Sequence, residues 1–225
     1  YDAESRVNTF VHVTHDPKEP RYGVLLCING TGILYRWLRN NIMKIGQAVI
    51  NYNQMNELAA QAPPGSDGLL ILPYGNGAER TLGNRDIGCI IHGLEFNTHN
   101  RRHYLRAAQE GIVFAIQHGL GIARNMGVRI TRVRAGNSNM FLSDLFGEIF
   151  ASMTGSTLEL YNADGSQGAA RGAGIGAGYY ENPSDAFVGL KTTRTIEPRE
   201  ELVEFYHDAY ERWLEILRAN MGENV

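Results

Sequence analysis

Hydrophobic and polar residues follow strand-like and helix-like patterns in turn along this chain. Residues 6–13 alternate between apolar and polar positions and residues 23–28 are continuously apolar, so the two segments are expected to form a β-hairpin with a long loop. A helix is expected to open at residues 29–32, because apolar residues then recur at helical spacing. Its expected buried face consists of Ile33, Leu34, Trp37 and Leu38.

The rest of the chain continues this alternation. Further strands are expected at residues 68–72, 89–94, 129–134 and 156–161. Further helices are expected at residues 53–61, 101–126, 141–153, 165–180 and 200–220. The order of elements, a hairpin followed by helices and strands in alternation, predicts an α/β layered domain.

The predicted helix at residues 165–180 is built almost wholly of glycine and alanine, after Asp164 as its cap. Each glycine disfavours a free helix by roughly 1 kcal/mol relative to alanine. We therefore expect this helix to pack in near contact with a sheet or a neighbouring helix, where small residues allow a close approach.

Composition and charge narrow the class of protein. Hydrophobic residues make up 43% of the chain and charged residues 20%, which is typical of a soluble globular protein. A net charge of -3 gives no electrostatic footprint for nucleic acid. No apolar stretch approaches the roughly 20 residues that a membrane-spanning helix needs, and no secretory leader is visible. Nucleic acid and membrane are therefore not expected as partners.

The two cysteines and the first residue bear on the setting of the protein. Cys27 and Cys89 each lie in an apolar run, which predicts small buried residues in a reducing compartment and hence a cytoplasmic location. The chain begins at Tyr1 and enters a strand pattern almost at once. We therefore expect it to be a piece of a longer polypeptide.

The segment at residues 132–143 is the strongest candidate for a ligand site. A β-rich run ends in Ala135-Gly136-Asn137-Ser138-Asn139, and a helix follows. A turn of small residues lets a flat ligand lie on bare backbone, and the Asn139 amide can both donate to and accept from the edge of a base. The pattern predicts an adenine–ribose site. The alternative is an ordinary strand–turn–helix corner with an asparagine cap.

Several short motifs in chain order carry a resemblance to a known family. They are Gly30-Thr31-Gly32 with Trp37-Leu38-Arg39, Leu72-Pro73-Tyr74 with residues 77–81, Gly93-Leu94, Arg106-Ala107 with Glu110-Gly111 and Phe114-Ala115, residues 170–178, and a tail with Val203, Tyr206 and Tyr210. Together they span essentially the whole chain. The chain resembles the C-terminal domain of the FGGY carbohydrate kinases, with the greatest likeness to the xylulose kinases of that family.

The resemblance implies a fold and an activity. The expected fold is α/β, the ribonuclease H-like ATPase lobe of actin, Hsp70 and sugar kinases, with a mixed sheet flanked by helices. Residues 1–225 would form one C-terminal nucleotide-binding lobe, and the N-terminal sugar-binding lobe would lie outside this chain. The implied reaction is ATP-dependent phosphorylation of D-xylulose to xylulose 5-phosphate. The alternatives are glycerol, gluconate or another pentulose as substrate, or a nonenzymatic nucleotide-binding module of the actin and Hsp70 type.

The resemblance also implies a set of site residues. The nucleotide-binding residues would be Gly30, Thr31, Gly32, Arg36, Ala135, Gly136, Asn137 and Asn139. The family carries a Gly-Gly-Gly/Ala turn where this chain has Ala135-Gly136-Asn137, so backbone approach is free only at Gly136. ATP and Mg²⁺ are the implied cofactors, with Mg²⁺ held mainly by the phosphates and the missing lobe. The implied partners are ATP, a sugar and the protein's own N-terminal lobe, and a homodimer is also compatible with the family.

No catalytic residue and no metal site is expected within the chain itself. The family's catalytic base is an aspartate of the N-terminal lobe, and Asp86, Asp144 and Asp164 stand in loop or capping positions. His99 and His103 have the spacing of metal ligands on a helix, but the flanking Arg101 and Arg102 would repel a cation.

Two further charged groups need a partner or solvent. Glu110 lies among apolar neighbours on the longest helix, where a buried carboxylate would need a counter-charge. Arg80 is one candidate, and exposure on a polar strip is the alternative. Arg101, Arg102 and Arg106 form either a solvated helix start or a surface that faces phosphate or the missing lobe.

Overall fold

The computed structural model describes residues 1–45 and 47–222. Its α-helices are α1 (Thr31–Asn41), α2 (Tyr52–Ala60), α3 (Arg101–Asn125), α4 (Asp144–Thr154), α5 (Gly165–Gly176) and α6 (Glu200–Asn220). Short 3-10 helices are η1 (Pro64–Gly68), η2 (Arg80–Leu82), η3 (Asn139–Leu142) and η4 (Pro183–Phe187). The strands are β1 (Asn8–Val11), β2 (Tyr22–Leu25), β3 (Lys44–Ile45), β4 (Ala48–Val49), β5 (Leu70–Tyr74), β6 (Gly88–His92), β7 (Val133–Gly136), β8 (Leu158–Tyr161) and β9 (Thr192–Ile196).

The strands form a mixed sheet and separate hairpins. In the mixed sheet, β8 lies between β7, to which it is parallel, and β9, to which it is antiparallel. The hairpin of β1 and β2 is antiparallel, as the sequence predicts, and β5 pairs with β6 in a second antiparallel hairpin. Strand β9 was not predicted, because the sequence TTRTI has a single apolar residue, Ile196, and lies at the edge of the sheet.

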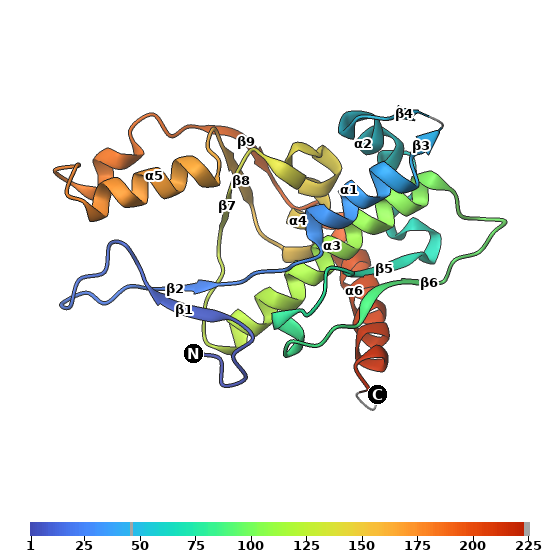
Figure 1. The fold of residues 1–225 in the computed structure, drawn as a ribbon, viewed down its shortest axis with the longest axis horizontal. Coiled ribbons are helices and arrows are strands. Elements are labelled where there is room, and N and C mark those ends of the chain that lie inside the picture. The colour runs from blue at the N-terminus through green and yellow to red at the C-terminus, as the bar shows by residue number, and fades with distance from the viewer. Residues whose placement is uncertain (46, 223–225) are drawn as a thin grey trace.

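Helix α3 runs diagonally through the centre of the molecule, behind α1 (Figure 1). Most of its residues are buried, against β5, α2, α4 and α1. A Cβ added at Gly111 would lie 2.1 Å from the carbonyl oxygen of Ile71, so only glycine lets the helix lie this close to β5. The Trp213 indole of α6 donates a hydrogen bond of 2.9 Å to the same carbonyl oxygen. The small residues of α3 thus allow the close helix packing that their pattern predicts.

Helix α5 differs from the expectation. Asp164 caps it by accepting a 2.9 Å hydrogen bond from the Gln167 amide, but none of its residues is buried. Figure 1 shows it projecting beyond the mixed sheet. Cβ atoms added at Gly168 and Gly172 would meet nothing within 4 Å. The predicted near-contact packing is therefore wrong along Gly168 and Gly172, although η4 lies beside α5 and a Cβ added at Gly174 would lie 2.5 Å from the Tyr180 ring.

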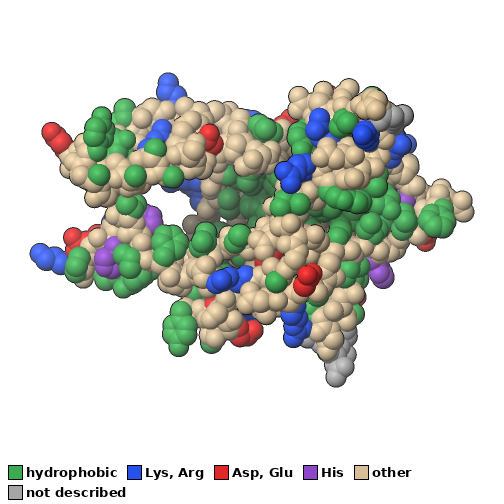
Figure 2. Space-filling model, in the orientation of Figure 1, with side chains coloured by type: hydrophobic (Ala, Val, Ile, Leu, Met, Phe, Trp, Pro, Cys, Tyr) green, Lys and Arg blue, Asp and Glu red, His purple; other side chains and the backbone are tan. Residues whose placement is uncertain are grey.

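Two apolar residues expected on the buried face of the first helix are exposed, as are the two cysteines. Tyr35 and Leu38 form the buried side of α1, whereas Ile33 and Trp37 are 41% and 51% exposed. The buried side is the one that contacts α3. It is rotated by about one residue around the helix from the face that the apolar spacing predicts. Cys27 and Cys89 are also exposed, so their interpretation as buried residues is wrong. Figure 2 shows apolar side chains gathered on the surface between α1 and the β5–β6 hairpin.

None of the helices in the described part of the chain combines the length and the hydrophobicity that crossing a membrane requires.

Candidate functional site

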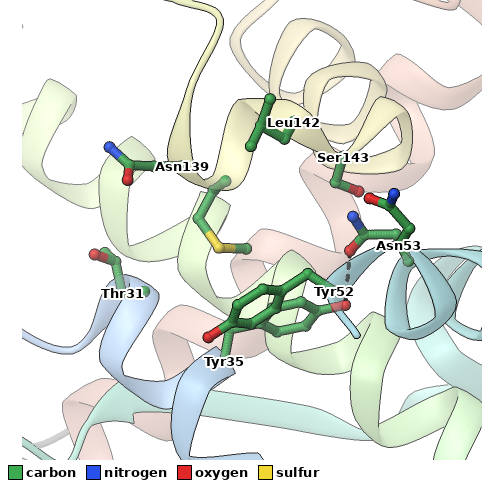
Figure 3. A pocket seen from close by; sticks show the side chains of 10 residues that line it. Thr31, Tyr35, Tyr52, Asn53, Asn139, Leu142 and Ser143 are labelled. Atoms are coloured by element: carbon green, nitrogen blue, oxygen red, sulfur yellow. Dashed lines mark hydrogen bonds between the residues drawn. The ribbon is translucent and has the colours of Figure 1, made fainter. Parts of the chain in front are cut away.

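A pocket of about 440 Å³ opens where the start of α1, the start of α2 and η3 meet. Thr31 and Gly32 come from α1, Asn139 begins η3, and Tyr52 and Asn53 come from α2. Figure 3 shows Thr31 and Asn139 at one end of the pocket and Asn53 and Ser143 at the other. The structure thus brings together three of the residues that the sequence assigns to one site.

Gly32 leaves an open side in this pocket. A Cβ added there would meet nothing within 4 Å. By contrast, a Cβ at Gly30 would lie 1.5 Å from the Pro73 carbonyl oxygen, and one at Gly136 would lie 2.2 Å from the Ala163 carbonyl oxygen. Packing inside the chain explains the glycines at 30 and 136, whereas at Gly32 the free space belongs to the pocket.

Asn139 has a backbone role as well as a place in the pocket wall. Its φ angle is 53°, in the left-handed region that asparagine tolerates better than most side chains. This conformation lets the chain turn from β7 into η3 directly after Ser138. Both alternatives for this turn, a ligand-facing residue and a structural corner, therefore have support at Asn139.

The other predicted site residues lie outside the pocket wall. Arg36 is exposed on α1, and Ala135 and Gly136 line a different depression beside α5. The Asn137 amide donates to the Tyr161 carbonyl at 2.8 Å, which continues the pairing of β7 with β8. Gly30 lines a third depression, next to Trp37. Their assignment to a nucleotide site stays a prediction.

Two tyrosines give the pocket an aromatic floor. The rings of Tyr35 and Tyr52 are stacked, with centroids 6.2 Å apart and planes inclined by 17°. The Arg39 guanidinium, which also comes from α1, lies 5.0 Å from the centre of the Tyr52 ring. This cation–π contact helps to hold the ring in place. Because Tyr52 is 43% exposed, its ring offers a flat apolar surface at the pocket.

A buried hydrogen-bond network lies behind this floor. The Tyr35 hydroxyl donates to Asn56 Oδ1 at 3.0 Å, the contact dashed in Figure 3. Gln109 Nε2 donates to the Tyr35 oxygen at 2.8 Å and to Asn56 Oδ1 at 3.2 Å. The Ser143 hydroxyl donates to Gln109 Oε1 at 2.9 Å and accepts from the Phe146 amide at 3.2 Å. The network ties α1, α2, α3 and α4 together directly beneath the pocket.

Burial raises the pKa of the Tyr35 hydroxyl well above its ordinary value, and the hydrogen bond from Gln109 lowers it only in part. The hydroxyl therefore keeps its proton at neutral pH and remains a donor to Asn56. The contribution of α2 was not predicted from the sequence, since Tyr52, Asn53 and Asn56 are typical of a solvated helix face. The available signal was the polar pair at Asn53 and Asn56, three residues apart on the predicted helix 53–61.

Glu110 is fully buried, and its partner is Arg106 rather than Arg80. Arg106 Nε donates to the Glu110 carboxylate at 2.9 Å, and the Gly65 amide and the Ser66 hydroxyl donate to it at 2.9 Å each. Burial raises the pKa of the Glu110 carboxyl, and the Arg106 charge opposes that rise. The predicted pairing with Arg80 is wrong, because an arginine one turn away on the same helix supplies the charge.

Arg106 is therefore not part of a solvated helix start. Its guanidinium also donates to the Ala62 carbonyl at 2.8 Å and to the Tyr206 hydroxyl at 2.9 Å, so it joins α3 to α6. His103 pairs with Asp67 at 3.0 Å. Among residues 1–45 and 47–222, no group of three histidine, cysteine or acidic side chains is arranged to hold a metal ion.

Comparison with known proteins identifies the family. Residues 3–180 match the model of the FGGY family of carbohydrate kinases, C-terminal domain. The chain belongs to the FGGY family. Its fold is that of the sugar kinases with an actin, Hsp70 and ribonuclease H-like ATPase domain, and the mixed sheet flanked by helices is confirmed.

Relatives within this family carry different sugar-kinase names. A xylulose kinase of Haemophilus influenzae is 29% identical over 174 residues, which are 73% of this chain and 34% of that protein. A gluconokinase of Bacillus subtilis is 31% identical over 117 residues, 48% of this chain and 22% of that protein. The crystal structure of xylulose kinase from Rhodospirillum rubrum superposes with a TM-score of 0.77 at 25% identity, covering 96% of this chain and 42% of that one. The FGGY chain described here thus spans about a third of the length of the first curated relative.

Proposed function

We propose that this chain is the C-terminal nucleotide-binding lobe of an ATP-dependent sugar kinase. One observation carries the proposal: in an FGGY C-terminal domain, the open side of Gly32 and the turn at Asn139 meet in a pocket with an aromatic floor. A volume of about 440 Å³ lies within the range of small-molecule sites. Tyr52 and Met140 supply apolar surface for the faces of a base, and Asn53 and Asn139 supply polar groups for its edges.

The proposed orientation places the phosphates toward the Thr31 end of the pocket. Gly30 and Thr31 stand at the start of α1, where unpaired backbone N–H groups and the helix dipole favour an anion. In the proposed reaction the terminal phosphoryl group passes to a sugar hydroxyl. The contribution of this chain is to bind and orient the nucleotide and to exclude water from its adenine base.

We propose that the catalytic base and the sugar pocket belong to an N-terminal lobe outside residues 1–225. The catalytic base is the group that accepts the proton of the sugar hydroxyl. Among the described residues no cluster is arranged to hold a metal ion, and we propose that Mg²⁺ is held by the nucleotide phosphates and the other lobe. The uncovered glycine face of α5 and the hollow between α5 and the β1–β2 hairpin, visible in Figure 2, support a second part of the protein beside this one.

D-xylulose is the proposed sugar, with xylulose 5-phosphate as product. Its support is the xylulose kinases among the relatives. Gluconate stands as the alternative because of the gluconokinase relative. A cytoplasmic location is proposed as well, because free exposed cysteines such as Cys27 and Cys89 persist in reducing compartments.

The pocket is tested by filling it. Gly32→Leu in the full-length protein is expected to weaken ATP binding by about tenfold or more, because the new side chain extends into the open side of the pocket from a Cβ that meets nothing within 4 Å. Isothermal titration calorimetry measures the effect. Gly121→Leu is the matched control, since Gly121 of α3 is equally open but lies outside this pocket. If the Gly32 variant and the wild type bind ATP with equal affinity, the proposed site is refuted.

A further inference from the structure

The side-chain amide of Asn56 is held with its oxygen turned away from the pocket. Asn56 Oδ1 accepts from the Tyr35 hydroxyl at 3.0 Å and from Gln109 Nε2 at 3.2 Å. A carbonyl oxygen has two lone pairs, so these two donors use its capacity. Asn56 therefore has no acceptor left for a bound molecule.

Ser143 sets the direction of the whole network. Its oxygen accepts from the Phe146 amide, so its own proton goes to Gln109 Oε1, 2.9 Å away. Gln109 must then present its amide nitrogen to Tyr35 and Asn56. The reversed arrangement would leave the buried Ser143 hydroxyl without an acceptor, which costs free energy. Gln109 is 0% exposed and Ser143 and Tyr35 are each 3% exposed, so water does not supply that acceptor.

The nitrogen of the same amide makes no hydrogen bond within the described residues, although Oδ1 of the same group has two partners. Asn56 lines the pocket between Asn53 and Tyr35. The Asn56 amide therefore presents two N–H groups to the pocket. Its hydrogen bonds to Tyr35 and Gln109 fix their orientation before a ligand binds.

We propose that Asn56 recognises the base of the nucleotide as a donor only, by hydrogen bonding to a ring nitrogen. This inference rests on the proposed nucleotide site. An asparagine that pairs with both edge groups of adenine must accept from the exocyclic amino group as well as donate to a ring nitrogen. Asn56 lacks the free acceptor for that pairing. N1, N3 and N7 are the ring acceptors of adenine that such a donor can reach, and Gln109 is the positioning residue that holds the amide.

The experiment compares ATP with its 1-deaza, 3-deaza and 7-deaza analogues, each of which lacks one ring nitrogen. Affinities are measured by calorimetry for the full-length wild type, Asn56→Asp and Gln61→Glu. The Asn56→Asp side chain keeps an oxygen toward Tyr35 and Gln109 but replaces the N–H donors with an acceptor. Gln61→Glu is the matched control, because it makes the same amide-to-carboxylate change at the exposed end of the same helix, outside the pocket.

The wild type is expected to bind one of the three analogues about tenfold or more weaker than ATP. Asn56→Asp is expected to bind ATP about tenfold or more weaker and to lose the difference between ATP and that analogue. Gln61→Glu is expected to keep that difference. Thermal denaturation checks that the variants are folded, and Asn56→Ala repeats the comparison without an added charge.

Separate results bear on the inference and on the site itself. If the wild type binds ATP and Gly32→Leu weakens it, but Asn56→Asp still discriminates the same analogue, Asn56 does not contact the base and the inference is overturned. If all three analogues bind the wild type as ATP does, it is overturned too. If the wild type does not bind ATP, or if the Gly32→Leu variant binds ATP normally, both the proposed site and the inference are refuted.

Discussion

At the scale of single residues, three glycines of one motif set play different parts. Gly30 allows α1 to begin against the Pro73 carbonyl, and Gly136 allows β7 to pass the Ala163 carbonyl. Gly32 alone faces free space. Sequence position does not separate these roles, because each depends on which atoms come close in the folded chain. A bulky residue at Gly136 therefore tests folding, and only Gly32 tests the pocket without that complication.

Glu110 and Arg106 make a second residue-scale prediction. Glu110→Gln is expected to lower the free energy of unfolding by about 3 kcal/mol, because it leaves the Arg106 guanidinium, 4% exposed, without its counter-charge. Urea denaturation measures the loss. Glu201→Gln is the matched control, since its partner Arg199 lies at the surface, and little change is expected there. A loss no larger than that of the control would show that hydrogen bonds alone hold Arg106.

At the scale of elements, α3 and α5 are both rich in small residues but stand in opposite surroundings. Gly111 and Gly119 of α3 touch other parts of the chain, whereas Gly168 and Gly172 of α5 touch none within 4 Å. The sequence predicts helices in both places, and both form. Its prediction of close packing is confirmed for α3 and wrong for α5, because composition records the size of side chains and not the presence of a neighbour.

This contrast predicts opposite effects of one substitution. Gly172→Ala in chain 1–225 is expected to stabilise the fold by up to about 1 kcal/mol, because alanine favours a helix and meets no atom there. Gly111→Ala is expected to destabilise it by about 2 kcal/mol, because the new methyl group would overlap the Ile71 carbonyl. Chemical denaturation of both variants tests the pair. Destabilisation by Gly172→Ala would mean that α5 packs against something within the chain.

At the scale of the whole molecule, the chain corresponds to only part of the length of its relatives. It spans 34% of the length of its xylulose kinase relative and 42% of the R. rubrum structure. The hollow between α5 and the β1–β2 hairpin in Figure 2 opens on the side that no described element covers. The wall residues named above for the pocket of α1, α2 and η3 all belong to this chain.

Catalysis is therefore expected from the full-length protein and not from this chain alone. In an assay coupled to ADP release, full-length protein is expected to turn over ATP with D-xylulose, and gluconate and glycerol serve as comparison substrates. Chain 1–225 is expected to show no sugar-dependent turnover, because positioning without a base and a sugar pocket does not transfer the phosphoryl group. Clear turnover by chain 1–225 would place the catalytic base within it and refute the assignment to another lobe.

Local pattern by itself determined the helices, most strands, the β1–β2 hairpin, and the motif set that marks an FGGY domain, since periodicity and turn residues act within a few positions of the chain. It also placed Thr31, Gly32 and Asn139 in one site, through the resemblance to the family. The tertiary structure alone decided that α2 supplies Tyr52 and Asn56 to that site, that Arg106 is the partner of Glu110, and that α5 stands uncovered. These features depend on the approach of segments far apart in sequence, and the fold creates that approach through the packing around α3.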